Sequence, residues 1–269
     1  MDWLQKALDK SKQNEKTSFQ FQTSSDLKKS FQPTTTSNTV GKDTVDFHTK
    51  QITPPNQFDE RLLLANQRDR NSVAAYNFLS AKIIQLLKRQ DDYSLAITSP
   101  TSGVGNTLTA ANLAISISRA LHETVVLIEL NLRAPSFYRL FGLNSNEQGL
   151  CDHLTNNQSL NDLFINIRGT EITLLPAGTA IDDVNILGSK KIRQLVRTLS
   201  SSFHNHIIVY DLPSLLDSED SLAFLPNIDA SLLVLEEGVS TPTQVTQCTD
   251  ILKNHGFLGT ILNKAVDIN

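Results

Sequence analysis

A glycine-rich stretch between an apolar run and a helical pattern is the feature that most constrains the fold of this chain. Residues 99–107 read Ser-Pro-Thr-Ser-Gly-Val-Gly-Asn-Thr; the apolar run 95–98 precedes them, and apolar residues with helical spacing follow over 108–121. A strand, a glycine turn and a helix start bring backbone N–H groups around one point, and the helix dipole adds partial positive charge there. This order of elements predicts a phosphate-binding loop.

The loop departs from the usual pattern at Asn106, because this position normally carries a lysine whose ammonium group reaches the outer phosphates. Thr107 follows and keeps a hydroxyl group suited to Mg²⁺. A simpler interpretation is that the two glycines only turn a strand into a helix. The predicted nucleotide contacts in the loop are Gly103, Val104, Gly105, Asn106, Thr107 and Leu108.

Composition limits the functional classes. The 269 residues, 39% of them hydrophobic, suffice for one α/β domain with an extension. A net charge of −4 argues against nucleic acid as a partner. Cys151 and Cys248 are the only cysteines and do not form a C-x-x-C pair, which favours a reduced, cytoplasmic protein. No run approaches the roughly 18 apolar residues of a membrane span, so we expect any membrane association to be peripheral or through a partner.

The first 57 residues differ from the rest of the chain. Residues 1–13 show a short amphipathic helical pattern with Trp3 and Leu4 on its apolar side, either a frayed terminus or a docking or membrane-surface helix. Residues 14–57 contain few aliphatic side chains among Gln, Ser, Thr and Lys, which predicts a disordered linker. The folded domain is predicted over residues 58–269.

Apolar runs and helical patterns alternate in that domain. Strands are predicted at 95–98, 124–129, 172–175, 206–211, 231–235 and 258–262, and further helices at 72–88, 190–202, 218–224 and 243–255. Such alternation is typical of a parallel sheet covered on both faces, a doubly wound α/β domain. Ligands of these sheets bind beyond the carboxyl ends of the strands, where the glycine loop, Glu129 and Asp211 fall.

Several segments resemble one family in the right order along 72–265. They include the loop at 98–105, Leu-Arg-Ala-Pro-Ser at 132–136, Arg-Leu-Phe-Gly-Leu at 139–143, Leu-Pro-Ala-Gly at 175–178, Tyr-Asp-Leu-Pro at 210–213 and Leu-Asn-Lys-Ala at 262–265. The family is that of the bacterial tyrosine kinases (BY-kinases) of exopolysaccharide and capsule biosynthesis, P-loop NTPases of the deviant Walker A type. The start of the chain, Trp-Leu-Gln-Lys-Ala-Leu at 3–8, is similar to their exosortase-associated subgroup.

The resemblance implies ATP or ADP with Mg²⁺ held by Thr107 and Asp211. It also implies a membrane polysaccharide co-polymerase or chain-length regulator as partner, at the inner membrane. Asn263 matches a family adenine contact, although an Asn after a strand is also a common turn residue.

The departures from the family fall on residues that handle charge. The family motif Asp-x-Asp-x-Arg appears as Glu129, Asn131 and Arg133, which with Asp211 are the predicted catalytic positions, yet an Asn cannot act as a base. Loss of the loop lysine is expected to weaken ATP binding about ten- to hundredfold. It is expected to slow phosphoryl transfer on the order of a thousandfold or more.

Two further family features are absent. The ring-forming motif Glu-x-x-Arg-x-x-Arg of the family reads Ala-Ala-Tyr-Asn-Phe-Leu-Ser at 74–80, which leaves a homo-oligomer in doubt. The last tyrosine is Tyr210, so the C-terminal tyrosine cluster of the family is missing. We therefore predict a pseudokinase-like, nucleotide-binding regulator of exopolysaccharide production. The alternatives are an active tyrosine kinase in which Arg133 or a partner replaces the lost cation, a nucleotide-free scaffold, and a partitioning ATPase of the same superfamily.

Overall fold

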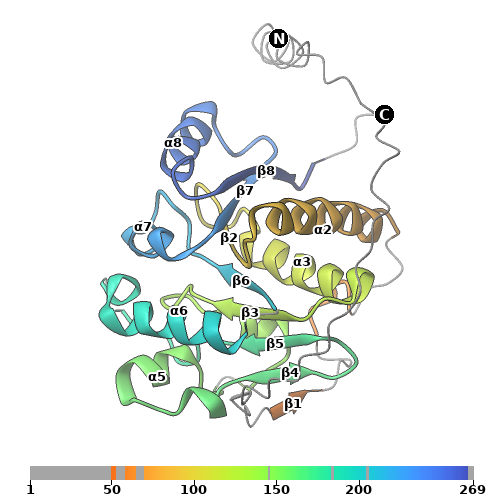
Figure 1. The fold of residues 1–269 in the computed structure, drawn as a ribbon. Helices are drawn as coiled ribbons and strands as arrows, with labels where there is room; N and C mark the ends of the chain where they lie inside the picture. The colour runs from red at the N-terminus through yellow and green to blue at the C-terminus, as the bar shows by residue number, and fades with distance from the viewer. Residues whose placement is uncertain are drawn as a thin grey trace, which may run out of the picture. The chain divides into compact units, whose positions relative to one another are not determined.

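The computed structural model describes residues 50–52, 58–64, 70–144, 146–182, 185–203 and 206–265, all within a unit that spans residues 44–269 (Figure 1). The predicted helix at 1–13 and most of the predicted linker at 14–57 lie outside these residues. No helix in the described part of the chain combines the length and apolar character needed to cross a bilayer.

The centre of the fold is a sheet with the order β1-β4-β5-β3-β6-β2-β7-β8. All neighbouring strands are parallel except β4 and β5, which pair antiparallel. The strands are β1 (Lys50–Ile52), β2 (Ser94–Thr98), β3 (Val125–Glu129), β4 (Ile165–Ile167), β5 (Ile172–Leu175), β6 (Ile207–Asp211), β7 (Ala230–Glu236) and β8 (Phe257–Asn263).

The doubly wound α/β prediction is confirmed, with two corrections at one edge of the sheet. The sheet is mixed rather than wholly parallel, because β4 runs against β5. The linker prediction is wrong for Lys50–Ile52, which forms β1 beside β4. β1 and β4 are each only three residues long, too short for a recognisable pattern of apolar residues.

Helices cover both faces of the sheet. They are α2 (Arg70–Gln90), α3 (Asn106–Leu121), α4 (Phe137–Leu140), α5 (Leu150–Asn156), α6 (Lys190–Ser202), α7 (Glu219–Phe224) and α8 (Pro242–Leu252), with short 3₁₀ turns at Leu160–Asp162, Ile186–Gly188 and Leu225–Asn227. The predicted helices begin and end within a few residues of those observed; α8 ends at Leu252 rather than at residue 255.

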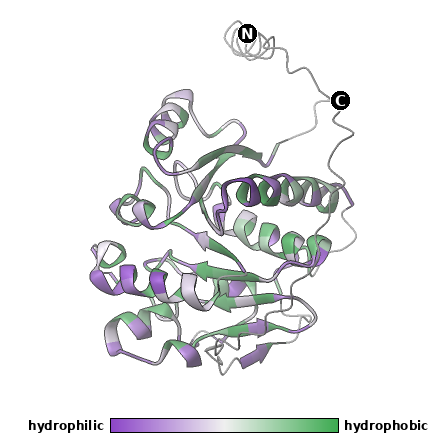
Figure 2. Ribbon diagram, in the orientation of Figure 1, coloured by the Kyte–Doolittle hydropathy of each residue, from purple (hydrophilic) through white to green (hydrophobic). Residues whose placement is uncertain are grey.

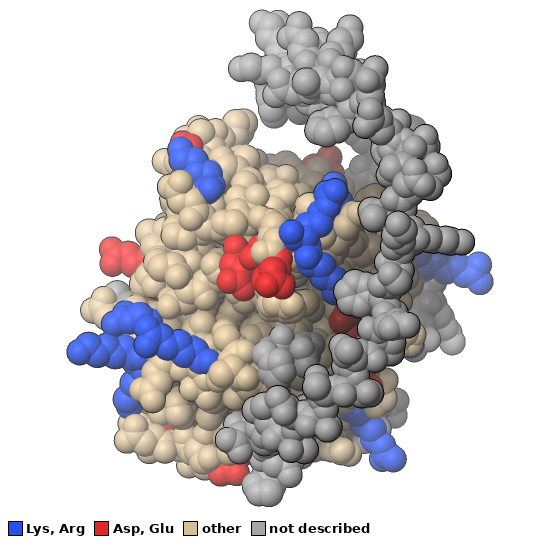
Figure 3. Space-filling view, viewed as in Figure 1, with Lys and Arg blue, Asp and Glu red and all other residues tan. Residues whose placement is uncertain are grey.

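Alternating side chains of the strands enter two separate cores. Val125 and Leu127 pack with α2 and α3 on one face, whereas Val126 and Ile128 pack with α5 to α8 on the other. Hydrophobic residues concentrate along the central strands and on α3, and α2 carries a more polar outer surface (Figure 2). On the face seen in Figure 3, charged side chains occur in small groups separated by uncharged surface.

The strand order places the predicted site. Because β3, β6 and β2 are neighbours, their carboxyl ends lie together at one edge of the sheet. Asp211 is in register with both Ile97 of β2 and Glu129 of β3. The loops that follow these three strands therefore meet.

Candidate functional site

The loop between β2 and α3 turns at two glycines with left-handed backbone conformations. Gly103 has φ +81° and Gly105 has φ +102°, which residues with a Cβ rarely adopt. Val104 between them is fully buried in the core and anchors the loop. Because α3 begins at Asn106, the N–H groups at its start are available to an anion at the helix N-terminus.

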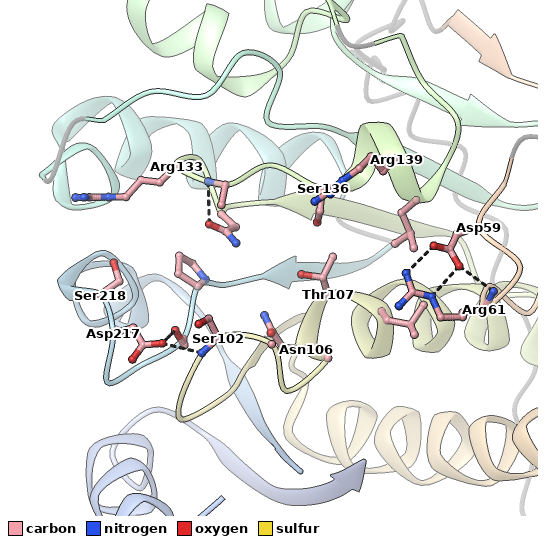
Figure 4. Close-up of a pocket in the computed structure, with 18 residues that line it drawn as sticks. Asp59, Arg61, Ser102, Asn106, Thr107, Arg133, Ser136, Arg139, Asp217 and Ser218 are labelled. Atoms are coloured by element: carbon pink, nitrogen blue, oxygen red, sulfur yellow. Dashed lines mark hydrogen bonds and ion pairs between the residues drawn. The ribbon is translucent and has the colours of Figure 1, made fainter. Parts of the chain in front are cut away.

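A cavity of about 570 Å³ opens at this loop (Figure 4). Its walls come from the loop, from the segment after β3, from the segment after β6 and from a stretch before α2. The lining residues with the most chemical relevance are Asp59, Arg61, Ser102, Asn106, Thr107, Asn131, Arg133, Arg139, Ser214 and Asp217. Of the predicted loop contacts, Gly103, Gly105, Asn106, Thr107 and Leu108 line it, whereas Val104 faces the core.

The side chain of Asn106 is directed towards the end of β6. Its Nδ2 donates to Oδ1 of Asp211 at 3.1 Å and to the carbonyl oxygen of Leu212 at 2.8 Å. The Ser99 hydroxyl donates to its Oδ1 at 3.3 Å. The amide thus links the loop to the neighbouring strand and offers no positive charge to the cavity.

Asp211 is fully buried, and its Oδ2 has no hydrogen-bond partner. Burial first, and the neighbouring Glu129 second, raise the pKa of Asp211 well above its usual range, while hydrogen bonds from Thr107 and Asn106 act in the opposite direction. A buried carboxylate with a free oxygen beside a threonine hydroxyl suits a divalent cation, which would stabilise the charged form. The structure therefore brings together the two predicted metal ligands.

A metal at this position would need ligands beyond the protein. Within the described ranges no group of three or more His, Cys, Asp or Glu side chains could hold one. Mg²⁺ is commonly bound through one or two carboxylates together with phosphate oxygens and waters. Thr107 and Asp211 fit that pattern only if a phosphate is present.

Glu129 lies behind the cavity wall. Its carboxylate accepts hydrogen bonds from the backbone N–H of Phe137 at 2.9 Å, of Ala177 at 3.0 Å and of Ser136. The side chain is 1% exposed, and burial raises its pKa despite these donors. Contrary to its predicted catalytic position, Glu129 does not line the cavity, and it fastens the segment after β3 to the end of β5.

Asn131 and Arg133, two of the predicted catalytic positions, line the cavity. The Asn131 Oδ1 accepts from the N–H of Ala134 at 3.3 Å. The Arg133 guanidinium pairs with Asp220 at 2.9 Å and with Asp182 at 3.0 Å. Arg133, the cation that would replace the lost lysine in the active-kinase alternative, is therefore already paired.

Asn263 closes the loop from the side opposite to Asp211. Its Nδ2 donates to the carbonyl oxygen of Val104 at 2.8 Å, and it is not a lining residue of the cavity. The adjacent Lys264 donates to the carbonyl oxygen of Gly103 at 3.0 Å and pairs with Glu236 at 2.8 Å. The amide predicted as an adenine contact thus supports the loop backbone.

Sequence reasoning missed four charged residues of the cavity. Asp217 accepts from the N–H of Ser102 at 2.7 Å, and Arg139 extends from α4 on the opposite wall (Figure 4). Asp59 and Arg61 form a two-pronged pair, and this hydrogen bonding lowers the pKa of Asp59 to about 2. Only Arg139 lies in a segment that matched the family; the others lie in stretches without a motif.

Comparisons with known proteins agree with this fold. No family model matches the chain. The tyrosine-protein kinase CpsD of Streptococcus pneumoniae is 27% identical over 173 residues, covering 63% of this chain and 75% of that protein. The tyrosine-protein kinase Etk of Escherichia coli K12 is 25% identical over 199 residues, covering 73% of this chain but only 27% of Etk.

Solved structures of other proteins share this fold. The kinase domain of VpsO superposes with a TM-score of 0.65 and 26% identity, covering 75% of this chain and 100% of that domain. The septum site-determining protein MinD of Pyrococcus horikoshii, solved with Mg-ADP, shares the fold with a TM-score of 0.52 and 21% identity, covering 63% of this chain and 69% of MinD. By sequence and by fold, the chain is thus a relative of the bacterial tyrosine kinases, as its motifs predicted.

Proposed function

We propose that this chain is a nucleotide-binding, BY-kinase-like regulator of exopolysaccharide or capsule production in which phosphoryl transfer is weak or lost. The observation that carries the proposal is the direction of the Asn106 side chain. Its amide donates to Asp211 and to Leu212, so the loop offers backbone N–H groups to phosphates but no ammonium group. Phosphoryl transfer depends on such charge, and its loss costs on the order of a thousandfold in rate.

Three features support nucleotide binding itself. The left-handed Gly103 and Gly105 give the loop the turn that lets N–H groups surround an anion. Thr107 and Asp211 would hold Mg²⁺, which neutralises phosphate charge when bound. The cavity of about 570 Å³ has the size of an ordinary ligand site.

The active-kinase alternative requires another cation at the phosphates. Arg133 is tied to two carboxylates, and one of them, Asp220, has a side chain only 6% exposed. Freeing the guanidinium would leave Asp220 as a buried, unpaired charge, which is strongly unfavourable. This observation argues against Arg133 as the replacement cation.

The proposed partner is a membrane polysaccharide co-polymerase or chain-length regulator, an inference from the kinship with tyrosine kinases such as CpsD and Etk. In this proposal the chain acts at the cytoplasmic side of the inner membrane through that partner. Nucleotide occupancy of the loop would then be read by the partner rather than used for phosphorylation.

Calorimetric titration of the full chain with Mg·ATP and Mg·ADP, beside an assay of labelled phosphate transfer to tyrosine, tests the proposal. We expect finite but weak binding without phosphotransfer, with and without the partner's cytoplasmic segments. Robust tyrosine phosphorylation would establish the kinase instead. Absence of binding by either nucleotide, in the wild type and in Asn106→Lys alike, would leave a scaffold.

A further inference from the structure

A carboxylate occupies the outer end of the phosphate loop. Asp217, from the segment after β6, accepts a hydrogen bond from the backbone N–H of Ser102 at 2.7 Å and one from the Ser214 hydroxyl at 2.8 Å. Figure 4 shows its side chain beside Ser102, with both interactions drawn. The N–H of Ser102 belongs to the loop that would surround phosphates, so an acidic side chain of the protein already holds one of its donors.

No ion pair within the described part of the chain involves Asp217. By contrast, Asp220 and Asp182 both pair with Arg133. A phosphate oxygen placed at the Ser102 N–H would therefore meet an unneutralised carboxylate.

The two ends of the loop have different neighbours. Thr107, at the start of α3, lies beside Asp211, and Gly105 lies against Asn263. Ser102 lies at the other end of the loop and lines the cavity together with Asn131 and Ser218. In a phosphate loop the backbone N–H groups hold the phosphates nearer the nucleoside. We therefore expect a third phosphate to extend from the helix start towards Ser102.

We infer that Asp217 makes this a site for nucleoside diphosphates, which binds Mg·ADP in preference to Mg·ATP; the inference rests on the proposed nucleotide binding. A diphosphate ends at the helix start and leaves Asp217 on the Ser102 N–H. A triphosphate has to displace the carboxylate from both hydrogen bonds and then lie beside its charge. Asn106 adds to the discrimination, since the ammonium that would favour the outer phosphate is absent.

The test compares Asp217→Asn with the wild type in calorimetric titrations of the full chain with Mg·ADP and with Mg·ATP. Asparagine retains an oxygen acceptor for the Ser102 N–H but carries no charge. We expect wild-type chain to bind Mg·ADP more tightly than Mg·ATP. The variant should bind Mg·ATP about tenfold more tightly than wild type, with Mg·ADP affinity changed by less than about threefold.

Glu219→Gln is the matched control. Glu219 is exposed at the start of α7 and does not line the cavity. Its substitution by Gln removes the same charge as Asp217→Asn, two residues further along the chain. We expect both affinities to stay within about twofold of wild type, because Glu219 lies outside the cavity and salt screens its charge from a bound phosphate. Thermal unfolding of both variants should match wild type, which excludes a folding defect.

Several outcomes would overturn the inference. An unchanged ratio of ATP to ADP affinity in Asp217→Asn would show that the carboxylate does not select the ligand. Weaker Mg·ATP binding by Asp217→Asn would indicate that Asp217 is a metal ligand. An equal gain in Mg·ATP affinity in Glu219→Gln would show that the effect comes from net charge alone. If wild type and Asp217→Asn both bind neither nucleotide, the proposed nucleotide binding fails with it; binding without the shift in ratio overturns the diphosphate preference alone.

Discussion

The Asn106 amide donates to Oδ1 of Asp211 at 3.1 Å, while Oδ2 of the same buried carboxylate has no hydrogen-bond partner. A lysine at this position would bring a positive charge near Asp211, whereas an amide supplies only a neutral donor. Because burial disfavours the charged carboxylate, Asp211 holds its proton to an unusually high pH unless a cation arrives. The loop and the predicted metal ligand are thus coupled through one neutral side chain.

Asn106→Lys is expected to strengthen Mg·ATP binding about ten- to hundredfold, because the ammonium forms charge-assisted hydrogen bonds with phosphate. Calorimetric titration of wild type and variant measures the change. Asn106→Ala is the control: it loses the bonds to Asp211 and Leu212 without gaining a cation, so its free energy of unfolding should fall by about 1–3 kcal/mol. Equal ATP affinities for the Lys and Ala variants would contradict the prediction.

Asp211→Asn should change how stability depends on pH. The pKa of Asp211 in the folded chain lies well above the ordinary value of 3.8. As pH rises above 3.8, the unfolded chain releases this proton while the folded chain keeps it, so this carboxyl lowers stability progressively until the folded pKa is passed. Asparagine does not titrate, so the wild type should lose stability relative to the variant between pH 4 and pH 8.

Urea denaturation of both proteins over that pH series, without Mg²⁺, measures the difference. Below pH 3.8 the carboxyl is neutral in both states, and the difference in unfolding free energy should become constant. Addition of Mg²⁺ at pH 7 should stabilise the wild type more than the variant. A difference that stays constant from pH 4 to pH 8 would show that Asp211 titrates normally in the folded chain.

The sequence predicted those parts of the site that depend on local order. A strand, the glycines at 103 and 105 and a helix start are contiguous, so their pattern identifies the loop without knowledge of the fold. Thr107 and Asp211 could be paired because the ends of neighbouring parallel strands meet at one edge. The central strands were recognisable for a related reason, since they are apolar throughout.

Other parts depend on contacts between distant segments. Asp217 and Ser102 are separated by 115 positions, and no local pattern indicates that a carboxylate would lie on a loop N–H. The family motif suggested a catalytic role for Glu129, but the side chain accepts from backbone groups at the start of α4 and after β5. The environment of Glu129 depends on tertiary packing, which a sequence motif does not describe.

Glu129→Ala is expected to destabilise the fold rather than weaken nucleotide binding. The substitution leaves the buried backbone donors of Ser136, Phe137 and Ala177 without their acceptor, and the free energy of unfolding should fall by about 3–5 kcal/mol. Glu129→Gln, which keeps one acceptor oxygen, should lose about half as much and bind Mg·ADP like wild type. Chemical denaturation and titration of the Gln variant measure both quantities.

The exposed Glu219→Ala serves as control and should change the unfolding free energy by less than about 0.5 kcal/mol. A Glu129→Gln protein that is as stable as wild type but no longer binds nucleotide would restore the catalytic or metal-binding role predicted from the family motif.

Arg139→Ala is expected to weaken both Mg·ADP and Mg·ATP binding about three- to tenfold. Arg139 lines the cavity on the wall opposite Asn106 and Thr107 (Figure 4). Its guanidinium lies 5.5 Å from the ring centre of Tyr138. A cation there attracts phosphate from across the cavity, with an effect limited by its exposure to solvent. Arg197→Ala removes the same positive charge on the exposed side of α6 and should leave both affinities unchanged.

Gly105→Ala should destabilise the loop more than Gly103→Ala does. Both glycines have positive φ, which costs a residue with a Cβ about 1–2 kcal/mol. A Cβ at Gly105 would also lie 2.4 Å from Nδ2 of Asn263, whereas at Gly103 it would meet nothing within 4 Å. In the Asn263→Ala background the steric part of the Gly105→Ala cost should vanish and the backbone part should remain. A double-mutant cycle of unfolding free energies measures this coupling, and its absence would show that Asn263 does not rest on the loop.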